Sequence, residues 1–275
     1  MHSVVVAVDS FKGSISAGAA AAALADGWRE VRPGDELVLR PMADGGEGTL
    51  DAFAAAIRGA RRMPVTVRGP HGGDVTASWL LLPGGTGVVE LASTSGIELL
   101  GGDLRPWSAD TRGFGQAIGA ALDHGVRRLV LGIGSSASTD GGAGMLAALG
   151  ARFADAAGLP IASGLQGLQH LAAADLSGLR PPPPGGVVVL SDVTSPLCGP
   201  RGAAAVFGPQ KGLSAADLPR ADAALARLAG LIAAVDPEQP GAGAAGGTGF
   251  GLLAWGARLV PGAAEVAELI ALRAA

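Results

Sequence analysis

The stretch LGIGSSASTDGGAG occupies residues 131–144, between an apolar strand candidate at 128–131 and a helix candidate at 143–149. Its glycines and hydroxyls predict a turn with free backbone N–H groups, and the following helix adds the positive end of its dipole. Such a turn is typical of a site for an anion such as phosphate. A second stretch, ADGGEGT at residues 43–49, repeats the Asp-Gly-Gly-x-Gly pattern before another helix candidate. Two acidic, glycine-rich loops therefore indicate a protein that handles phosphate.

The composition favours an α/β protein with one large or two smaller domains. The chain has 275 residues, of which 48% are hydrophobic, and it contains 46 glycines and 18 prolines. This composition predicts many loops between short apolar elements. The net charge of −4 argues against nucleic acid as a partner, because binding to a duplex requires a basic face. We therefore expect phosphate to be bound by local groups.

Cysteine usage and the N-terminus favour a cytoplasmic protein. The single cysteine, Cys198, cannot form an intrachain disulfide or a cysteine metal cluster, as expected in a reducing compartment. Residues 1–8 lack the basic segment of a signal peptide, and the longest uncharged run, 239–257, is interrupted by glycines. We therefore expect a first strand at the N-terminus and no association with a membrane.

The basic residues show an unusual bias toward arginine. Of the 20 basic residues, the two lysines are Lys12 and Lys211, which leaves 18 arginines. Each lysine precedes a glycine in a context typical of a turn. A flexible ammonium group suits phosphate, whereas an arginine fork suits planar, bidentate partners. Chance explains the bias about equally well when no other motif is considered.

Hydrophobic periodicity predicts alternating strands and helices in the first part of the chain. The predicted elements up to residue 91 are a strand at 3–8, a helix at 16–31, a strand at 36–40, a helix at 49–58, a hairpin at 63–68 and 75–82, and a strand at 88–91. The change from alternating strands and helices to a hairpin pattern predicts a domain boundary near residue 60. We expect the first unit to be Rossmann- or flavodoxin-like.

The second half of the chain has a sparser pattern. The predicted elements there are a helix at 111–123, strands at 128–131 and 187–190, a helix from Ser214 to about residue 235, a flexible linker at 236–249, and helices at 250–260 and 263–273. Four prolines at 181–184 predict an extended connector. No further strand is expected after the linker.

Four loops share one pattern, in which a strand end is followed by aspartate with hydroxyls or glycines. They occupy residues 9–14, 44–49, 135–144 and 191–194. Carboxylates at strand ends suit Mg²⁺ or a general base, and backbone amides, hydroxyls and lysines suit phosphates. A helix cap or turn explains any single loop equally well. Four such loops in one chain favour a common site.

Other sequence fingerprints point to alternative phosphate or nucleotide sites. The chain has no G-x-x-x-x-G-K-[ST] motif, so a P-loop kinase is not indicated. Gly132, Gly134 and Ala137 fit the loose dinucleotide-binding pattern, with Asp155 at the spacing of the ribose acid. Residues 134–137 are also similar to the glycine–serine phosphate loop of the galactokinase–homoserine kinase–mevalonate kinase superfamily. The four histidines show no metal-binding spacing.

Five ordered motifs resemble those of bacterial glycerate kinases, and they cover nearly the whole chain. They are DSFKGS at 9–14, ADGGEGT at 43–49, GSSASTDGGAGM at 134–145, SDVTSPLCGP at 191–200 and FGPQKG at 207–212, and GGTGFG at 246–251 is similar to a further one. The resemblance implies transfer of the γ-phosphoryl group of ATP to D-glycerate with Mg²⁺, and 2-phosphoglycerate as the product.

The resemblance also implies an architecture. It predicts two α/β domains with the active site in the cleft between them, the first with parallel strands and the second mixed. The expected division is 1–60 for the first domain, 61–248 for the second, and 249–275 for C-terminal helices that return toward the first. Members of the family usually continue with a further C-terminal segment whose motifs this sequence lacks.

Two alternatives stay open for the function. One is a truncated, non-catalytic homologue or assembly subunit that binds a nucleotide or a small anion. The other is a kinase of a different small hydroxy acid. An incomplete first sheet would expose an edge that a second copy could cover, so a homo-oligomer is one expected arrangement.

Roles for individual residues follow from the resemblance and from the chemistry of phosphoryl transfer. Asp192 is expected to accept the proton of the attacking hydroxyl, and Asp9 and Asp44 to hold Mg²⁺. Lys12 and Lys211 are expected to neutralise phosphate or the substrate carboxylate, with Lys12 and Asp9 counted among the catalytic groups. The expected substrate- and phosphate-binding residues are Ser10, Gly45, Gly46, Glu47, Gly48, Thr49, Ser135, Ser136, Asp140, Gly141, Gly142, Thr194, Gln210 and Lys211.

Overall fold

A large mixed β-sheet is the centre of the protein, seen in a computed structural model that describes residues 2–11, 14–270 and 272. Within these residues the sheet has six strands in the order β10-β9-β6-β5-β4-β3. The first four are parallel, and β4 and β3 run antiparallel to their neighbours. The strands are β3 (Arg61–Arg68), β4 (Asp74–Leu82), β5 (Thr86–Glu90), β6 (Arg128–Gly132), β9 (Val187–Leu190) and β10 (Arg258–Val260). The α/β class with a mixed sheet is confirmed.

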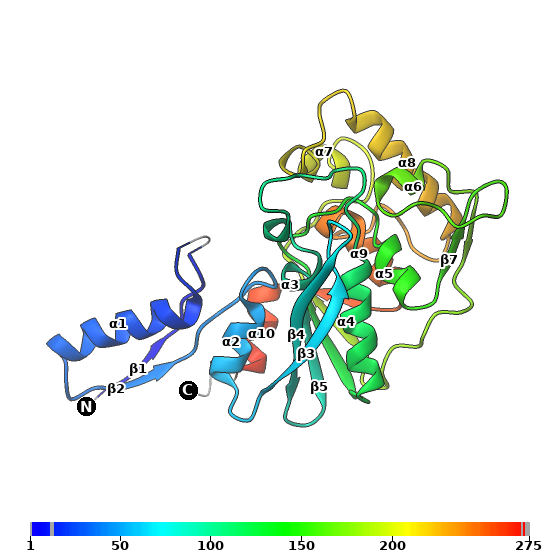
Figure 1. Cartoon of the computed structure of the whole chain (residues 1–275). Coiled ribbons are helices and arrows are strands. Elements are labelled where there is room, and N and C mark those ends of the chain that lie inside the picture. The colour runs from blue at the N-terminus through cyan, green and yellow to red at the C-terminus, as the bar shows by residue number, and fades with distance from the viewer. Residues whose placement is uncertain (1, 12–13, 271, 273–275) are drawn as a thin grey trace.

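Helices cover both faces of this large sheet (Figure 1). Alternate strand residues point to opposite faces, so Val89 and Leu131 join one core while Val88 and Val130 join the other. The first core lies under α4 (Arg112–Asp123), α5 (Ala143–Ala148), α8 (Leu218–Leu231) and α9 (Ala244–Ala254). The second lies under α2 (Thr49–Ala56) and α10 (Gly262–Leu269). Burial on both faces explains the continuous apolar runs of the parallel strands.

A small N-terminal arm extends away from the large sheet (Figure 1). It consists of β1 (Ser3–Val6) and β2 (Glu36–Leu39), which pair in parallel, and α1 (Ala17–Val31). The hydroxyl of Ser16 accepts a hydrogen bond from Ala19 N at 3.3 Å and caps α1, as the sequence predicts. Because α2 packs on the large sheet through Leu50 and Phe53, the chain leaves the arm between β2 and α2. The division into domains stays a prediction.

Shorter elements complete the fold. They are α3 (Ala92–Ser95), η1 (Ile97–Leu100), β7 (Arg152–Ala154), α6 (Leu165–Leu168), β8 (Ala173–Asp175), α7 (Ala203–Phe207) and η2 (Pro209–Lys211). Strands β7 and β8 form an antiparallel pair. Among the described residues, no helix combines the length and the apolar character needed to cross a membrane.

The expected helices and strands up to residue 190 are present, with ends that differ by a few residues. The start of the next helix is wrong, because α8 begins at Leu218 and not near Ser214. The Ser214 hydroxyl donates to Asp217 Oδ2 at 2.6 Å, so the serine forms a turn before the helix and does not cap it.

The linker expected at 236–249 is also wrong. Its second half is buried, and α9 begins there. A Cβ atom on Gly243 would lie 2.1 Å from Pro196 O, and one on Gly249 would lie 2.1 Å from Gly241 O. These glycines therefore allow close backbone packing, which the sequence does not distinguish from flexibility.

The absence of a further strand is the third wrong expectation. Strand β10 pairs in parallel with β9 and forms one edge of the large sheet. The helix expected at 250–260 ends early because Gly256 adopts a φ of +90°, a conformation that favours glycine at helix ends. The three-residue strand that follows is too short for its periodicity to be recognised.

Candidate active site

Two glycine-rich loops meet beyond the carboxyl ends of β6 and β9. Gly134 N donates to Gly45 O at 2.9 Å, and this hydrogen bond joins the loop after β6 to the loop before α2. A Cβ on Gly45 would lie 2.5 Å from Leu190 O, and one on Gly134 would lie 2.5 Å from Gly46 Cα. Side chains at these positions would push the loops apart. Ligands of α/β proteins typically bind at this end of a parallel sheet.

The Asp192 pocket lies at this junction and has a volume of about 260 Å³. It is lined by Asp44, Gly45, Gly46, Ser135 and Asp192, which come from three different loops. Asp44 Oδ1 accepts from Gly46 N at 2.8 Å, and Asp192 Oδ1 accepts from Gly262 N at 3.1 Å. Each hydrogen bond orients its carboxylate and involves one oxygen. Both carboxylates therefore face the pocket, with acceptor capacity that remains available.

A neighbouring space, the Lys211 pocket, has a volume of about 570 Å³ and shares Ser135 with the Asp192 pocket. Glu47, Ser136, Gln210 and Lys211 also line it. Ser135 has a φ of +57°, a backbone conformation that costs a non-glycine residue about 1 kcal/mol or more. Such strain is often found where a protein contacts its ligand.

Lys211 supports the loop from beneath. Its ammonium group donates to Ser136 Oγ at 2.7 Å and to Ser138 O at 2.5 Å, and the residue is 2% exposed. Burial lowers the pKa of Lys211 to about 7, against the opposing effect of the Asp140 charge. The lysine therefore holds the Ser136 region in place, and its amino group lies at the floor of the pocket.

The Asp-Gly-Gly segment of the same loop lies in the interior. Asp140 is fully buried, and its carboxylate accepts hydrogen bonds from Thr111 N and Oγ1, Ser138 Oγ, Gly142 N and Gly144 N at 2.8–3.2 Å. Burial, and then the charge of Asp110, raise the pKa of Asp140. A Cβ on Gly141 would lie 2.4 Å from Leu228 Cδ2. Asp140, Gly141 and Gly142 are thus not brought together with Asp44 and Asp192.

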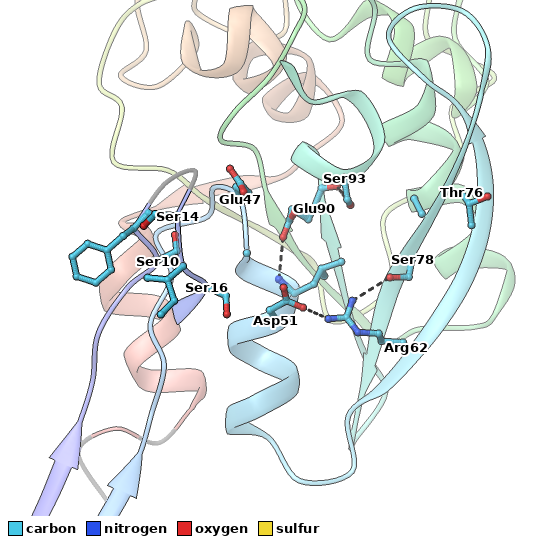
Figure 2. A pocket seen from close by; sticks show the side chains of 15 residues that line it. Ser10, Ser14, Ser16, Glu47, Asp51, Arg62, Thr76, Ser78, Glu90 and Ser93 are labelled. Atoms are coloured by element: carbon cyan, nitrogen blue, oxygen red, sulfur yellow. Dashed lines mark hydrogen bonds and ion pairs between the residues drawn. The ribbon is translucent and has the colours of Figure 1, made fainter. Parts of the chain in front are cut away.

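The third space, the Glu90 pocket, separates the arm from the large sheet and has a volume of about 620 Å³ (Figure 2). It contains three of the predicted residues, Ser10, Glu47 and Gly48, and it shares Glu47 with the Lys211 pocket. The arm contributes residues 10, 11 and 14–16 to one wall, and β4, β5 and α2 contribute to the opposite wall.

Glu90 is a site residue that the sequence analysis missed. It ends β5, is 5% exposed, and accepts from Leu50 N through Oε2 at 3.0 Å. Burial raises the pKa of Glu90 to about 7, although the Leu50 amide acts in the opposite direction. A perturbed acid in a pocket is a candidate for function. The available signal was the carboxylate at the end of an apolar strand, as at Asp9 and Asp192.

Other predicted residues lie at the edges of these pockets or away from them. Lys12 lies outside the described residues. Asp9 is exposed, accepts from Ser10 N at 2.6 Å, and is not among the described residues that line the three pockets. Thr49 is buried and donates to Gly46 O at 2.7 Å, and Thr194 is exposed. Within the described ranges, no three His, Cys, Asp or Glu side chains form a metal-binding group.

Comparison with known proteins places the chain in a family. The model of the glycerate kinase family matches residues 4–275. Glycerate 2-kinase of Escherichia coli K12 is 45% identical over 94% of this chain and 70% of its own length. Glycerate kinase of Bacillus subtilis 168 is 44% identical over 92% and 68%. The crystal structure of a glycerate kinase 2 from Salmonella typhimurium LT2 superposes with a TM-score of 0.91 and 43% identity, covering all of this chain and 75% of that one. The chain therefore belongs to the glycerate kinase family.

Proposed function

We propose that this protein transfers the γ-phosphoryl group of ATP to a hydroxyl group of glycerate. The observation that carries the proposal is the Asp192 pocket, where two carboxylates lie beside the glycine-rich turn at Gly134 and Ser135 at the carboxyl end of the sheet. Relatives that are 44–45% identical over most of the chain are named glycerate kinases. This arrangement has the parts that phosphoryl transfer requires, which are a proton acceptor, an anion cradle and a second acidic group.

Asp192 acts as the general base in this mechanism. Its Oδ1 is held by Gly262 N at 3.1 Å, so the carboxylate has a defined position from which it accepts the proton of the attacking hydroxyl. Phosphoryl transfer depends mainly on positioning and on neutralisation of charge. Ser135 offers its backbone N–H group to the transferred phosphoryl oxygens, while Gly134 N is engaged by Gly45 O and fixes the turn. Lys211 keeps that loop in place through Ser136 and Ser138.

The donor set of the Asp192 pocket fits Mg²⁺. Mg²⁺ is usually bound by one or two carboxylates together with nucleotide phosphates, so a cluster of three acidic side chains is not required. Asp44 is the carboxylate that would hold the ion, since Gly46 N engages one of its oxygens. A bound Mg²⁺ would offset the negative charge of the phosphates. Participation of Asp9 and Lys12 stays a prediction.

The position of phosphorylation on glycerate is part of the proposal. The Escherichia coli relative carries the name glycerate 2-kinase, and we expect the 2-hydroxyl to be the acceptor here as well. ³¹P NMR of the product distinguishes 2-phosphoglycerate from 3-phosphoglycerate. A 3-phosphoglycerate signal would overturn this part of the proposal and leave the phosphoryl transfer intact.

A coupled assay of ADP release tests the function. The purified protein is supplied with ATP and Mg²⁺, and the acceptors are D-glycerate, L-glycerate, lactate and glycolate. We expect release of ADP that depends on D-glycerate and on Mg²⁺. Release with another hydroxy acid alone would favour a kinase of a different acceptor. No acceptor-dependent release from folded protein would contradict the proposal and favour a non-catalytic binding protein.

A further inference from the structure

All three pockets contain acidic side chains, but they differ in the basic group that a ligand can meet. The Lys211 pocket is lined by Glu47 and Glu98 and also contains Lys211, whose amine donates to a hydroxyl and a carbonyl group and not to a carboxylate. The Asp192 pocket is lined by Asp44 and Asp192, and the Glu90 pocket by Glu47, Asp51 and Glu90. An arginine, Arg62, also lines it, but Arg62 forms an ion pair with Asp51 and donates to Ser78 Oγ at 3.3 Å. The described lining therefore disfavours an anion and suits a ligand that donates hydrogen bonds.

Hydroxyl groups are the donors that this lining suits best. Figure 2 shows Glu90, Glu47 and Ser93 on the side of the large sheet, and Ser10, Ser14 and Ser16 on the side of the arm. Carboxylates and serine hydroxyls together accept and donate hydrogen bonds in the pattern that a polyol requires. The lining also includes Phe11, Ile15 and Leu50, which add apolar area. A neutral ligand with hydroxyls and an apolar part fits both kinds of wall.

The location of the pocket connects it to the proposed reaction. Glu47 belongs to both the Glu90 pocket and the Lys211 pocket, and Ser135 belongs to both the Lys211 pocket and the Asp192 pocket. The spaces are therefore consecutive. The volume of about 620 Å³ is within the range of roughly 300–1,000 Å³ typical of small-ligand sites. A nucleotide has a neutral, hydroxyl-bearing nucleoside followed by anionic phosphates. This order matches the Glu90 pocket followed by the Lys211 pocket.

We propose that the Glu90 pocket binds the nucleoside part of the nucleotide, with Glu90 accepting a hydrogen bond from a ribose hydroxyl, while the phosphates extend past Glu47 toward Lys211. This assignment rests on the proposed function, because it takes the donor to be ATP. Glu90 Oε2 already accepts from Leu50 N, so the same side chain fixes the start of α2 and presents its carboxylate to the ligand. A charged hydrogen bond of this kind contributes about 1.5–3 kcal/mol, or roughly 10- to 100-fold in affinity.

The protonation state of Glu90 provides a second observable. The pKa of Glu90 is raised to about 7 by burial, with smaller effects of the charges of Asp51 and Glu47. Arg62, which also lines the pocket, is paired with Asp51. The ionised carboxylate is the stronger acceptor, so preference for the ribose hydroxyl increases as the pH rises through about 7. If Glu90 had a purely structural role, the preference for one ligand hydroxyl would not change with pH.

Calorimetric titration with Mg²⁺ and three probes tests the assignment. The probes are ADP, 2′-deoxy-ADP and 3′-deoxy-ADP, and the proteins are wild type, Glu90→Gln and the control Glu238→Gln, an exposed acid outside the pockets. Glutamine keeps an acceptor for Leu50 N. We expect wild type and control to bind one deoxy probe at least about 10-fold more weakly than ADP. In Glu90→Gln, ADP affinity falls by a similar factor and the discrimination disappears.

Several outcomes would overturn the assignment. They are failure of wild type to bind ADP, equal affinity of wild type for all three probes, and discrimination that is unchanged in Glu90→Gln. If the variant does not fold, the wild-type discrimination measured at pH 6 and pH 8 replaces it, and the assignment fails unless discrimination is greater at pH 8. Because binding needs no turnover, Glu90-dependent discrimination without acceptor-dependent ADP release would support this assignment and contradict the kinase function. If the protein phosphorylates glycerate but Glu90→Gln discriminates among the probes as wild type does, the kinase function is supported and this assignment is contradicted.

Discussion

The segments at residues 44–48 and 140–144 have nearly the same sequence, DGGEG and DGGAG, yet they occupy opposite environments. In both, the aspartate Oδ1 accepts from the glycine two residues later, at 2.8 Å in Asp44 and 3.2 Å in Asp140. Both contain glycines with positive φ, and a helix follows the first segment at Thr49 and begins within the second at Ala143. Asp44 is exposed and lines a pocket, whereas Asp140 is fully buried.

The difference comes from the elements that surround each segment. Leu228 of α8 and Gly251 of α9 contact the glycines of the second segment, and Thr111 bonds Asp140. The first segment instead faces the ends of β6 and β9. The start of α10 packs against the backbone of Asp44 through Gly262, but the Asp44 side chain stays exposed at the pocket. The motif therefore specifies a local turn, and tertiary packing decides whether its aspartate serves stability or chemistry. Substitutions in the two segments should separate these roles.

The largest effect is expected for Asp140→Ala. The change leaves buried N–H and O–H donors of Thr111, Ser138, Gly142 and Gly144 without their acceptor. Loss of a buried network of this kind costs about 3–5 kcal/mol in the free energy of unfolding. Urea denaturation measures it, with Asp44→Ala as the matched control, which removes the single acceptor of Gly46 N and is expected to cost about 1 kcal/mol. Equal destabilisation by the two variants would remove the distinction between the segments.

The next effect concerns Glu90, which accepts a hydrogen bond from Leu50 N in the helix that follows the exposed segment. The folded pKa of Glu90 is raised from 4.5 to about 7, so the folded state holds its proton more tightly than the unfolded state does. The contribution to stability is complete below about pH 4.5 and is lost as the pH rises through about 7. The loss is roughly 3 kcal/mol if the shift is fully realised. Urea midpoints between pH 4.5 and 7.5 should show this decline in wild type and not in Glu90→Gln.

A catalytic effect of similar size is expected for Asp44→Asn. Asparagine keeps the acceptor for Gly46 N but removes the charge that would hold Mg²⁺. We expect kcat/KM for ATP to fall about 100-fold, which corresponds to about 2.7 kcal/mol. The unfolding free energy should stay within about 0.5 kcal/mol of wild type. If Asp44→Asn had the same kinetics as wild type at limiting Mg²⁺, the exposed aspartate would have no such role.

The smallest effects should come from glycines at matching places before the two helices. Gly48 has a φ of +85° with open space around it, so Gly48→Ala should cost about 1 kcal/mol from backbone strain. Gly142 has a φ of +77°, and a Cβ there would lie 3.1 Å from Gly251 Cα. Gly142→Ala should therefore cost about 2 kcal/mol, because crowding adds to strain. Thermal unfolding of both variants checks the order, and a larger shift for Gly48→Ala would reverse the comparison.

Local signals predicted much of the fold. The Ser16 cap, the hairpin of β3 and β4 and the turns of both Asp-Gly-Gly segments depend on neighbouring residues, and each was recognisable from sequence. Strand β10 and the buried half of the expected linker were not, because both depend on distant partners. The glycines that pack against Pro196 have the same composition as a flexible segment.

The site was predicted to a similar extent. The loops of Asp44, Ser135, Asp192 and Lys211 were recognised, and the structure brings all of them to adjoining pockets. The burial of Asp140 was not foreseeable, since Leu228 and Gly251 follow it by about 90–110 residues in the sequence. Glu90 was missed because it lies inside the strand predicted at 88–91, and a single acid there, with no glycine beside it, is a weak signal.

The turnover of Asp192→Asn at saturating ATP and glycerate tests whether Asp192 is the general base. Asparagine preserves the acceptor for Gly262 N and removes the group that takes the proton of the attacking hydroxyl. We predict a kcat at least about 100-fold below wild type, with an unfolding free energy within about 0.5 kcal/mol. A kcat within twofold of wild type would contradict catalysis by Asp192 in this pocket.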